Sequence, residues 1–193
     1  MTTRRHLAGL AVAACAIAPA AAEPASYTLD PTHSFVAFEL LHFYTSTIRG
    51  RFGPIQGRVL LDREARSGHV GVEIETGSAS TGVPLLDVQL RGSAMLDAAA
   101  FPKATFVARG FSFDDRGGVS AVRGEFILRG TSRALELKAL RYRCYTSPLF
   151  GREVCGGDFE GEIVRSAFGV THSLPFVSDR VRLLVQVEAV RDP

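Results

Sequence analysis

Four histidines outside the first 22 residues are the side chains best suited to acid–base or metal chemistry: His33, His42, His69 and His172. No two of them are four residues apart, and none lies beside a cysteine. Zinc sites often contain histidines four residues apart or next to a cysteine, and this chain has neither arrangement. A site built from His33, His42 and His172 would require three distant loops to converge. We therefore expect no bound metal ion.

Serine residues do not complete a catalytic set with these histidines. Ser34 and Ser173 each follow a histidine, but adjacent residues of a strand point to opposite faces, so this adjacency does not predict a Ser–His nucleophile pair. The chain has no Gly-x-Ser-x-Gly motif and no glycine-rich phosphate loop. We expect a protein without enzymatic activity and without a cofactor.

The first 22 residues have the pattern of a signal peptide. Two arginines precede an apolar run over residues 7–18, and three alanines before Glu23 form an A-x-A-like cleavage site. We therefore expect residues 1–22 to direct export and residues 23–193 to form one mature domain. The twin-arginine route and lipoprotein processing at Cys15 are alternatives to an ordinary signal peptide.

Cys144 and Cys155 are the two cysteines of the predicted mature chain. An even number of cysteines in an exported protein predicts a disulfide, which here would close a loop of about ten residues between two strands. A redox-active or metal-binding pair is the alternative, although the two cysteines lack C-x-x-C spacing and a nearby histidine.

The stretch that must position His42 runs from Leu29 to Gly57 and has the pattern of two long strands. Its first half alternates, so that Val36, Phe38 and Leu40 share one face with His42. Glycines in its second half indicate bulges, bends or close backbone approach, which curl a sheet toward closure. These glycines are Gly50, Gly53 and Gly57.

His42 is expected to point toward the interior near one rim of the sheet. In one interpretation it is a partly buried imidazole whose hydrogen bonds are made within the protein. In another, it orients the head group of a ligand. An alternative of a different class is an enzyme that acts on a small apolar substrate, with His42 as its acid or base.

The remainder of the mature chain predicts an all-β fold with one helical insertion. Pro84 opens the helical segment, which carries two apolar stripes, one with Val88 and Met95 and the other with Leu86 and Leu90. With the first two strands, the further segments make an antiparallel eight-stranded barrel or sandwich. The further strand segments are 68–76, 103–113, 119–128, 134–145, 158–168 and 179–190.

Overall charge and hydropathy exclude two classes of partner. Removing residues 1–22 lowers Lys+Arg from 22 to 20 against 20 Asp+Glu, so the mature chain has no net charge to attract nucleic acid. Outside the leader, no apolar run reaches the roughly 18 residues of a membrane span. We expect neither nucleic-acid binding nor a stable membrane span.

Motifs along the whole mature chain resemble the YceI-like family, in the family's order. They are Asp30-x-x-His33-Ser34, Ser80-Thr81-Gly82, Leu96-Asp97, Phe101-Pro102, the hairpin Gly124–Ser132 and Arg165-Ser166-x-Phe168-Gly169. The family consists of bacterial, mostly periplasmic, lipocalin-like barrels that bind polyisoprenoid lipids. The resemblance therefore implies a lipocalin-like barrel in the periplasm that binds, and transports or stores, a long polyisoprenoid or isoprenoid quinone; it is also compatible with a homodimer.

Apolar side chains spread over several strands would line the binding site. An eight-stranded barrel encloses either side chains alone or one ligand, so an ordinary filled core is the alternative. A nine-residue strand is roughly 30 Å long, which suits a rod-like apolar molecule. The expected ligand-binding residues are Val36, Phe38, Leu40, His42, Phe52, Val72, Ile74, Val88, Met95, Phe106, Phe126 and Phe168.

Overall fold

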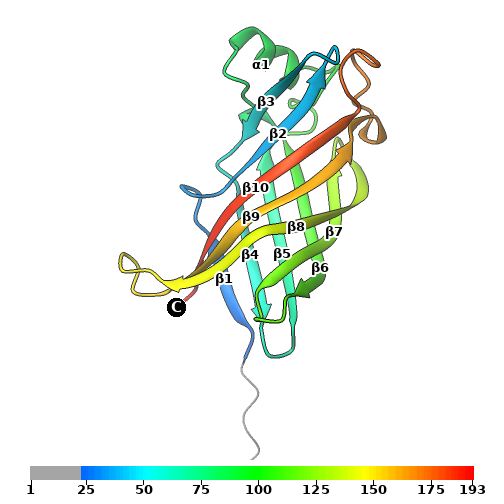
Figure 1. The fold of residues 1–193 in the computed structure, drawn as a ribbon. Coiled ribbons are helices and arrows are strands. Elements are labelled where there is room, and N and C mark those ends of the chain that lie inside the picture. Colours follow the sequence, from blue (N-terminus) through cyan, green and yellow to red (C-terminus); the bar gives the residue numbers. More distant parts are fainter. Residues whose placement is uncertain (1–22) are drawn as a thin grey trace, which may run out of the picture.

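The computed structural model describes residues 23–193, which form a closed antiparallel β-barrel with one short α-helix at one end (Figure 1). The predicted signal peptide, with its cleavage site and Cys15, lies outside the described residues. The described strands number ten, but they occupy eight positions in the ring, because two positions each hold two shorter strands. The predicted eight-stranded lipocalin-like barrel is confirmed.

The elements follow one another along the ring with few exceptions. Neighbours in the sheet run in the order β1-β4-β5-β6-β7-β8-β9-β10-β2-β3, and β1 also pairs with β10. The strands are β1 (Ala25–Leu29), β2 (Phe35–His42), β3 (Ser46–Phe52), β4 (Gln56–Asp62), β5 (Ser67–Glu75), β6 (Lys103–Phe113), β7 (Val119–Leu128), β8 (Thr131–Thr146), β9 (Glu153–Val164) and β10 (Arg180–Arg191). The helices are η1 (Thr76–Ser78), α1 (Pro84–Arg91) and η2 (Arg165–Phe168).

Strand β10 closes the ring by pairing with two strands in succession. Its first half pairs with β2, where Leu183 faces Phe38, and its second half pairs with β1, where Ala189 faces Leu29. Strands β1 and β2 are therefore one long strand interrupted by a turn at residues 30–34. In the same way, β3 and β4 continue one another on the neighbouring position.

The two interruptions have local causes in the sequence. At the first, the Asp30 carboxylate accepts a hydrogen bond from the backbone N–H of Thr32 at 2.9 Å, which turns the chain. At the second, Gly53 has a φ of +140°, a conformation that favours glycine, and it precedes a proline. Of the three glycines, Gly53 therefore marks a break in the strand.

Gly50 allows a close approach inside the barrel. A Cβ atom at this position would overlap the ring of Phe38 on the paired strand, and its absence leaves the space that the ring fills. The opening hairpin thus curls inward over its own aromatic side chain.

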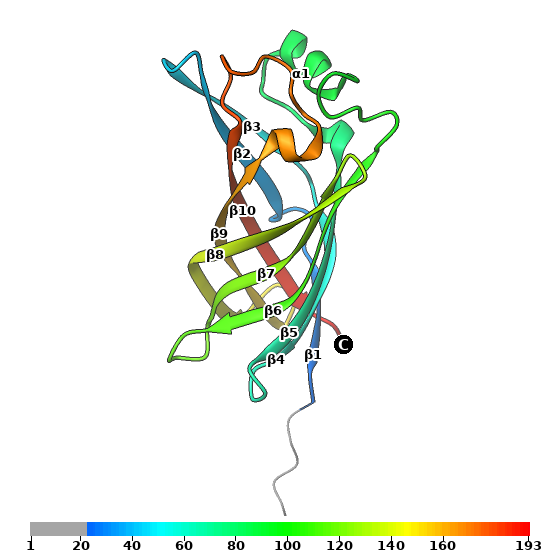
Figure 2. The same cartoon turned by 90° about the vertical axis from the view of Figure 1, so that its right-hand side faces the viewer.

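The barrel has two different ends, seen clearly from the side in Figure 2. We call the end with α1, the β2–β3 turn at residues 43–45 and the loop at residues 169–179 the mouth end (Figures 1 and 2). The floor end carries the β4–β5 turn at 63–66, the β6–β7 turn at 114–118 and the β8–β9 loop at 147–152. Among the described residues, no helix is both long enough and apolar enough to span a bilayer.

Several strand boundaries differ from the predicted ones. Strand β9 begins at Glu153 rather than at residue 158, because residues 153–157 already pair with β8 and β10. The strand predicted over 158–168 ends at Val164, and residues 165–168 form η2, because the Ser166 N–H and hydroxyl bind the carboxylate of Asp179. The turn predicted over 130–133 is shorter, since Arg129 and Gly130 both adopt positive φ and β8 begins at Thr131.

The predicted disulfide is confirmed between Cys144 and Cys155. The two residues face each other directly in the β8–β9 ladder, with 4.1 Å between their Cα atoms. The bond joins neighbouring strands at the floor end, as expected for a structural link.

Candidate functional site

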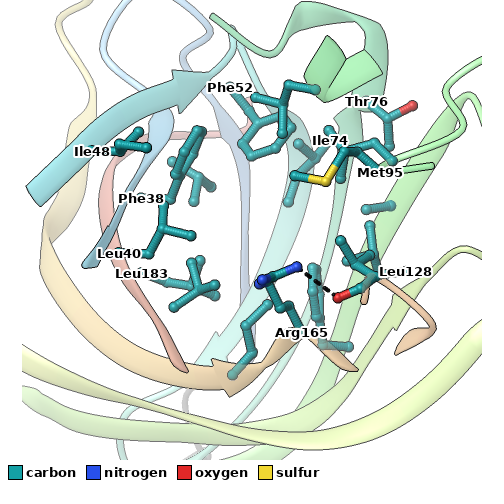
Figure 3. Close-up of a pocket in the computed structure, with 18 of the residues that line it drawn as sticks. Phe38, Leu40, Ile48, Phe52, Ile74, Thr76, Met95, Leu128, Arg165 and Leu183 are labelled. Carbon is teal, nitrogen blue, oxygen red and sulfur yellow. Dashed lines mark hydrogen bonds between the residues drawn. The ribbon is translucent and has the colours of Figure 1, made fainter. Parts of the chain in front are cut away.

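A cavity of about 240 Å³ lies inside the mouth half of the barrel. Figure 3 shows aromatic and aliphatic side chains from opposite walls pointing into it, with Phe38 and Leu40 facing Ile74, Met95 and Leu128. Strands supply these side chains at alternate positions, because every second residue of a barrel strand points inward. The alternation predicted for β2 is confirmed, since Val36 and Phe38 are buried and line this cavity.

Most of the predicted site residues meet at this cavity. Ten of the twelve line it: Val36, Phe38, Leu40, His42, Phe52, Val72, Ile74, Met95, Phe106 and Phe126. They come from β2, β3, β5, β6, β7 and the segment after α1. For the strand residues among them, period-2 patterns were therefore sufficient to predict which side chains face the interior.

Val88 does not lie where the helical spacing predicts it. Its side chain is 68% exposed on the outer side of α1, whereas Leu86, Gln89 and Leu90 line the cavity. The cause is Asp87, which is buried and accepts hydrogen bonds from the N–H and hydroxyl of Thr81. These bonds fix the rotation of the helix about its axis, so that the stripe with Leu86 and Leu90 faces the cavity.

Phe168 is also away from the cavity wall. It lies in η2 rather than in a strand, and its buried ring packs edge-on against Phe126 with 5.6 Å between ring centroids. It therefore supports a cavity residue from behind.

Arg165 is a wall residue that sequence reasoning missed. It is only 4% exposed, and its guanidinium donates hydrogen bonds to the backbone carbonyls of Val170, His172, Val177 and Ser178 at 2.8–2.9 Å. Burial lowers the pKa of this guanidinium. Arg165 therefore anchors the loop at 169–179 over the mouth end (Figure 3). Its place in the Arg165-Ser166-x-Phe168-Gly169 motif was the only signal in the sequence.

Polar side chains gather at the opening of the cavity. Gln89 of α1 and His172 of the loop at 169–179 are exposed, and their Nε2 atoms lie 3.1 Å apart across the mouth. Ser173 and His42 also line the cavity at this rim. His42 makes an edge contact with Phe43, and within residues 23–193 no side chain hydrogen-bonds to its imidazole. The rim can thus contact a polar group, whereas the interior offers almost only apolar surface.

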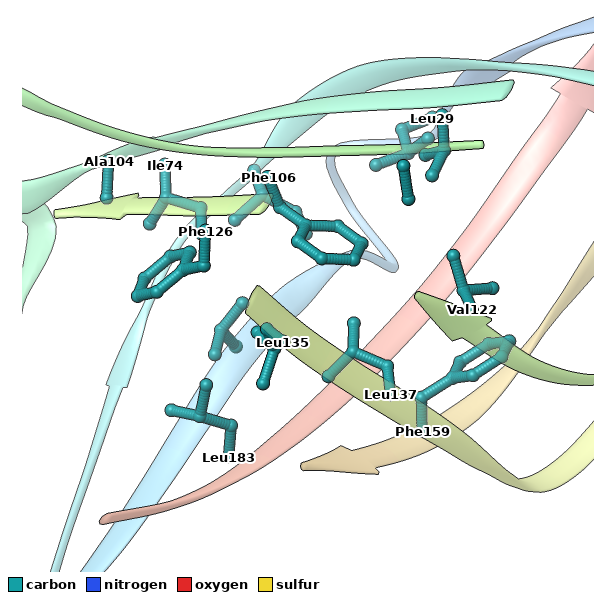
Figure 4. Close-up of a cluster of buried hydrophobic side chains, with 14 of the residues drawn as sticks. Leu29, Ile74, Ala104, Phe106, Val122, Phe126, Leu135, Leu137, Phe159 and Leu183 are labelled. Carbon is teal, nitrogen blue, oxygen red and sulfur yellow. The ribbon is translucent and has the colours of Figure 1, made fainter. Parts of the chain in front are cut away.

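Buried side chains close the cavity toward the floor end. Figure 4 shows Phe159 beside Leu137 and Val122, next to Phe106, with Leu29 farther along the barrel. Phe159, Val122 and Leu29 belong to the buried core but not to the cavity wall. The barrel is therefore neither fully hollow nor fully packed: it holds a pocket with one open end.

A polar cluster lies at the floor end below this core. The Tyr27 hydroxyl donates to the Glu153 carboxylate at 2.5 Å, and an Arg63 nitrogen lies 3.0 Å from the same oxygen and 2.9 Å from both disulfide sulfurs. Burial and the bond to Glu153 raise the pKa of Tyr27 to about 12. Cys144, Glu153 and Cys155 are near enough together to suit a metal ion, but the two sulfurs are bonded to each other. This cluster stabilises the end of the barrel.

His33 belongs to the turn that separates β1 from β2. Its Nδ1 lies 2.7 Å from the Asp30 carboxylate, and the hydrogen bond raises the pKa of this exposed imidazole. His33 is thus part of the turn and does not line the cavity.

Comparison with known protein families identifies one match over nearly the whole described chain. The model of the YceI-like domain matches residues 27–189. A UPF0312 protein of Yersinia pestis (strain Pestoides F) is 29% identical over 190 residues, which cover 97% of each chain. A UPF0312 protein of Shewanella denitrificans is 28% identical over 192 residues, which cover 97% of this chain and 99% of that protein.

Solved structures with the same barrel come from several bacteria. Burkholderia cenocepacia BcnA has a TM-score of 0.67 at 20% identity, covering 83% of this chain and 98% of that one. The Campylobacter jejuni YCEI protein has a TM-score of 0.65 at 22% identity, over 79% and 90% of the two chains. A domain of Saccharophagus degradans, described as polyisoprenoid-binding and implicated in plant cell wall breakdown, has a TM-score of 0.58 at 17% identity, over 87% and 99%. At these identities the likeness shows the shared fold.

Proposed function

Because the chain belongs to the YceI-like domain family, we propose that it binds the tail of a long polyisoprenoid lipid or isoprenoid quinone inside its barrel. The protein is proposed to act as a binding protein rather than an enzyme, and to need no cofactor. The polyisoprenoid-binding domain from Saccharophagus degradans, which shares the fold, supports this ligand class.

The observation that carries the proposal is the apolar pocket with one open end. Each methylene transferred from water to such a wall contributes about 0.8 kcal/mol, so a tail is held along its length rather than by a single contact. Polar side chains are confined mainly to the rim, where Gln89, His172 and Ser173 are exposed. The tail would enter first, and the head group would remain at the mouth.

We further propose that this binding takes place in the periplasm, where the protein carries or stores its lipid. The predicted export signal supports this location, and the Cys144–Cys155 disulfide is typical of oxidising compartments. We also propose that the protein forms a homodimer, which is compatible with the family resemblance. Sedimentation velocity measures its oligomeric state.

Lipid extraction from the purified protein tests the proposal. Organic extracts analysed by mass spectrometry are expected to contain a prenyl lipid. Leu183→Trp should remove it, because Leu183 is buried on the cavity wall and the larger indole would fill the space. Leu184→Trp is the matched control, because Leu184 is the next residue of β10, absent from the cavity wall.

Circular dichroism and thermal unfolding show whether the Leu183→Trp and Leu184→Trp variants are folded. Overpacking a core costs about 1–3 kcal/mol, so the melting temperature of Leu183→Trp must be shown to lie above the growth temperature. An extract of the wild-type protein without prenyl lipid, or equal lipid in both variants, would contradict the proposal.

A further inference from the structure

Exposed apolar side chains surround the mouth of the cavity. They belong to three separate segments: the β2–β3 turn, the start of α1 and the loop at 169–179. Figure 2 shows these segments gathered at one end of the barrel. The side chains are Phe43, Tyr44, Val83, Leu85, Val88 and Phe176.

The aromatic part of this ring is held rigidly outward. Phe43 and Tyr44 have φ values of 47° and 55°, a conformation that costs of order 1–3 kcal/mol for a bulky side chain and is often found at functional sites. The Phe43 N–H donates to the Phe176 carbonyl at 2.7 Å, and the two rings stack with 5.3 Å between centroids. Two segments far apart in the sequence thus present one fixed aromatic pair to solvent.

Exposed charges are sparse in the described mouth-end segments 43–45, 76–102 and 165–179. Their carboxylates belong to buried or half-buried residues, and Arg91 is their exposed arginine. The turns of the floor end expose charges of both signs: Glu64, Asp114, Asp115, Arg63, Arg66, Arg116 and Arg152. Exposed aromatic and aliphatic side chains with few charges among them are typical of a surface that lies at a membrane interface.

We propose that the mouth end docks onto a lipid bilayer, with Phe43, Leu85 and Phe176 inserted among the head groups. This inference rests on the proposed function, because it explains how an apolar tail reaches the pocket without crossing water. Exposing a tail to water costs about 0.8 kcal/mol for each methylene. A mouth seated on the membrane gives the tail a continuous apolar path from the bilayer to the cavity.

Vesicle co-sedimentation tests the docking surface. The purified protein is mixed with vesicles of phosphatidylglycerol and phosphatidylethanolamine, or of phosphatidylcholine alone. We expect binding to both kinds of vesicle and a loss of about tenfold or more in the double variant Leu85→Ser/Phe176→Ser. The matched control is Leu149→Ser/Phe150→Ser at the floor end, since Leu85 and Leu149 are both 82% exposed.

Binding of farnesol, a short prenyl alcohol, is measured in parallel without vesicles. Both double variants should bind it as the wild type does, because none of the four residues lines the cavity. Absent vesicle binding, or equal losses in both variants, would overturn the docking surface even if farnesol still binds. Vesicle binding without farnesol binding would support docking and instead contradict the proposed ligand. Self-association that disappears in Leu85→Ser/Phe176→Ser, measured by sedimentation velocity, would assign the surface to a second copy and overturn the proposal.

Discussion

At the scale of single residues, Arg165 is the side chain on which the mouth depends most. Its four hydrogen bonds to loop carbonyls replace contacts that residues 169–179 would otherwise make with water. A buried guanidinium that satisfies a loop in this way leaves several carbonyls unpaired when it is removed.

Replacing Arg165 with Met should therefore destabilise the protein by about 2–4 kcal/mol and loosen the loop. Urea unfolding measures the stability, and hydrogen exchange reports on residues 169–179. Arg180→Met is the control, because Arg180 is exposed and pairs with Glu162 on the outer surface, an interaction worth less than about 1 kcal/mol. Equal losses in the two variants would show that Arg165 does not anchor the loop.

His42 gives a second test at this scale, since it lies at the rim of the cavity. A single rim contact contributes about 0.5–1 kcal/mol, so His42→Ala should weaken farnesol binding by about two- to fivefold. His69→Ala is the control, because His69 does not line the cavity. Fluorescence competition measures both affinities. Unchanged affinity in His42→Ala would remove His42 from the site, and a turnover lost with it would favour the enzyme alternative.

Sequence patterns predicted inward residues well where one face of a strand is apolar. In β2 the alternation of Val36 and Phe38 with outward residues leaves one orientation that buries both. Arg165 could not be found in this way, because its partners are backbone carbonyls, which every sequence possesses. Its role exists only once the loop has folded back over the barrel.

At the scale of elements, helix α1 shows how a single carboxylate sets an orientation. The helix has apolar residues on two stripes, so periodicity alone could not decide between Val88 and the pair Leu86 and Leu90. Asp87 decides it, because Thr81 donates two hydrogen bonds to its carboxylate. These bonds hold the pKa of Asp87 below its usual range.

The attachment of α1 should consequently depend on pH. A carboxyl group with a lowered pKa in the folded state stabilises the protein above its unfolded pKa of about 4, and this stabilisation is lost as the pH falls through the folded value. The wild type should thus have a higher melting temperature than Asp87→Asn at pH 6, and the difference should shrink below about pH 4. Differential scanning calorimetry measures this difference.

The exposed Asp115 supplies the control for this experiment. Asp115→Asn lies in the β6–β7 turn at the floor end and should leave the pH dependence of stability unchanged. A gap between wild type and Asp87→Asn that stays constant from pH 6 to pH 3 would contradict the role assigned to the Asp87 carboxylate.

The strands themselves were predictable, and their interruptions were partly so. Glycines at positions 50, 53 and 57 indicated bends, and the structure uses Gly53 for the break between β3 and β4. The short helix η2 was not predicted, because residues 165–168 directly continue the segment that was predicted as a strand over 158–168. The hydrogen bonds from Ser166 to Asp179 end the strand at Val164 instead.

At the scale of the whole molecule, the barrel is a pocket rather than a tunnel. Side chains such as Phe159 and Leu29 pack the floor half, and the Tyr27–Glu153–Arg63 cluster lies at its end. The sequence predicted that the sheet closes around an apolar interior, but not where along the barrel the packed core ends and the cavity begins. That boundary depends on how side chains from facing strands meet across the barrel, which no local pattern contains.

A crystal structure of the protein grown with geranylgeraniol tests the central claim most directly. We predict a prenyl chain inside the mouth half, in contact with Phe38, Phe106 and Leu128, with its hydroxyl group near Gln89 and His172. Electron density for the lipid only on the outer surface, or a cavity filled by its own side chains, would contradict the account.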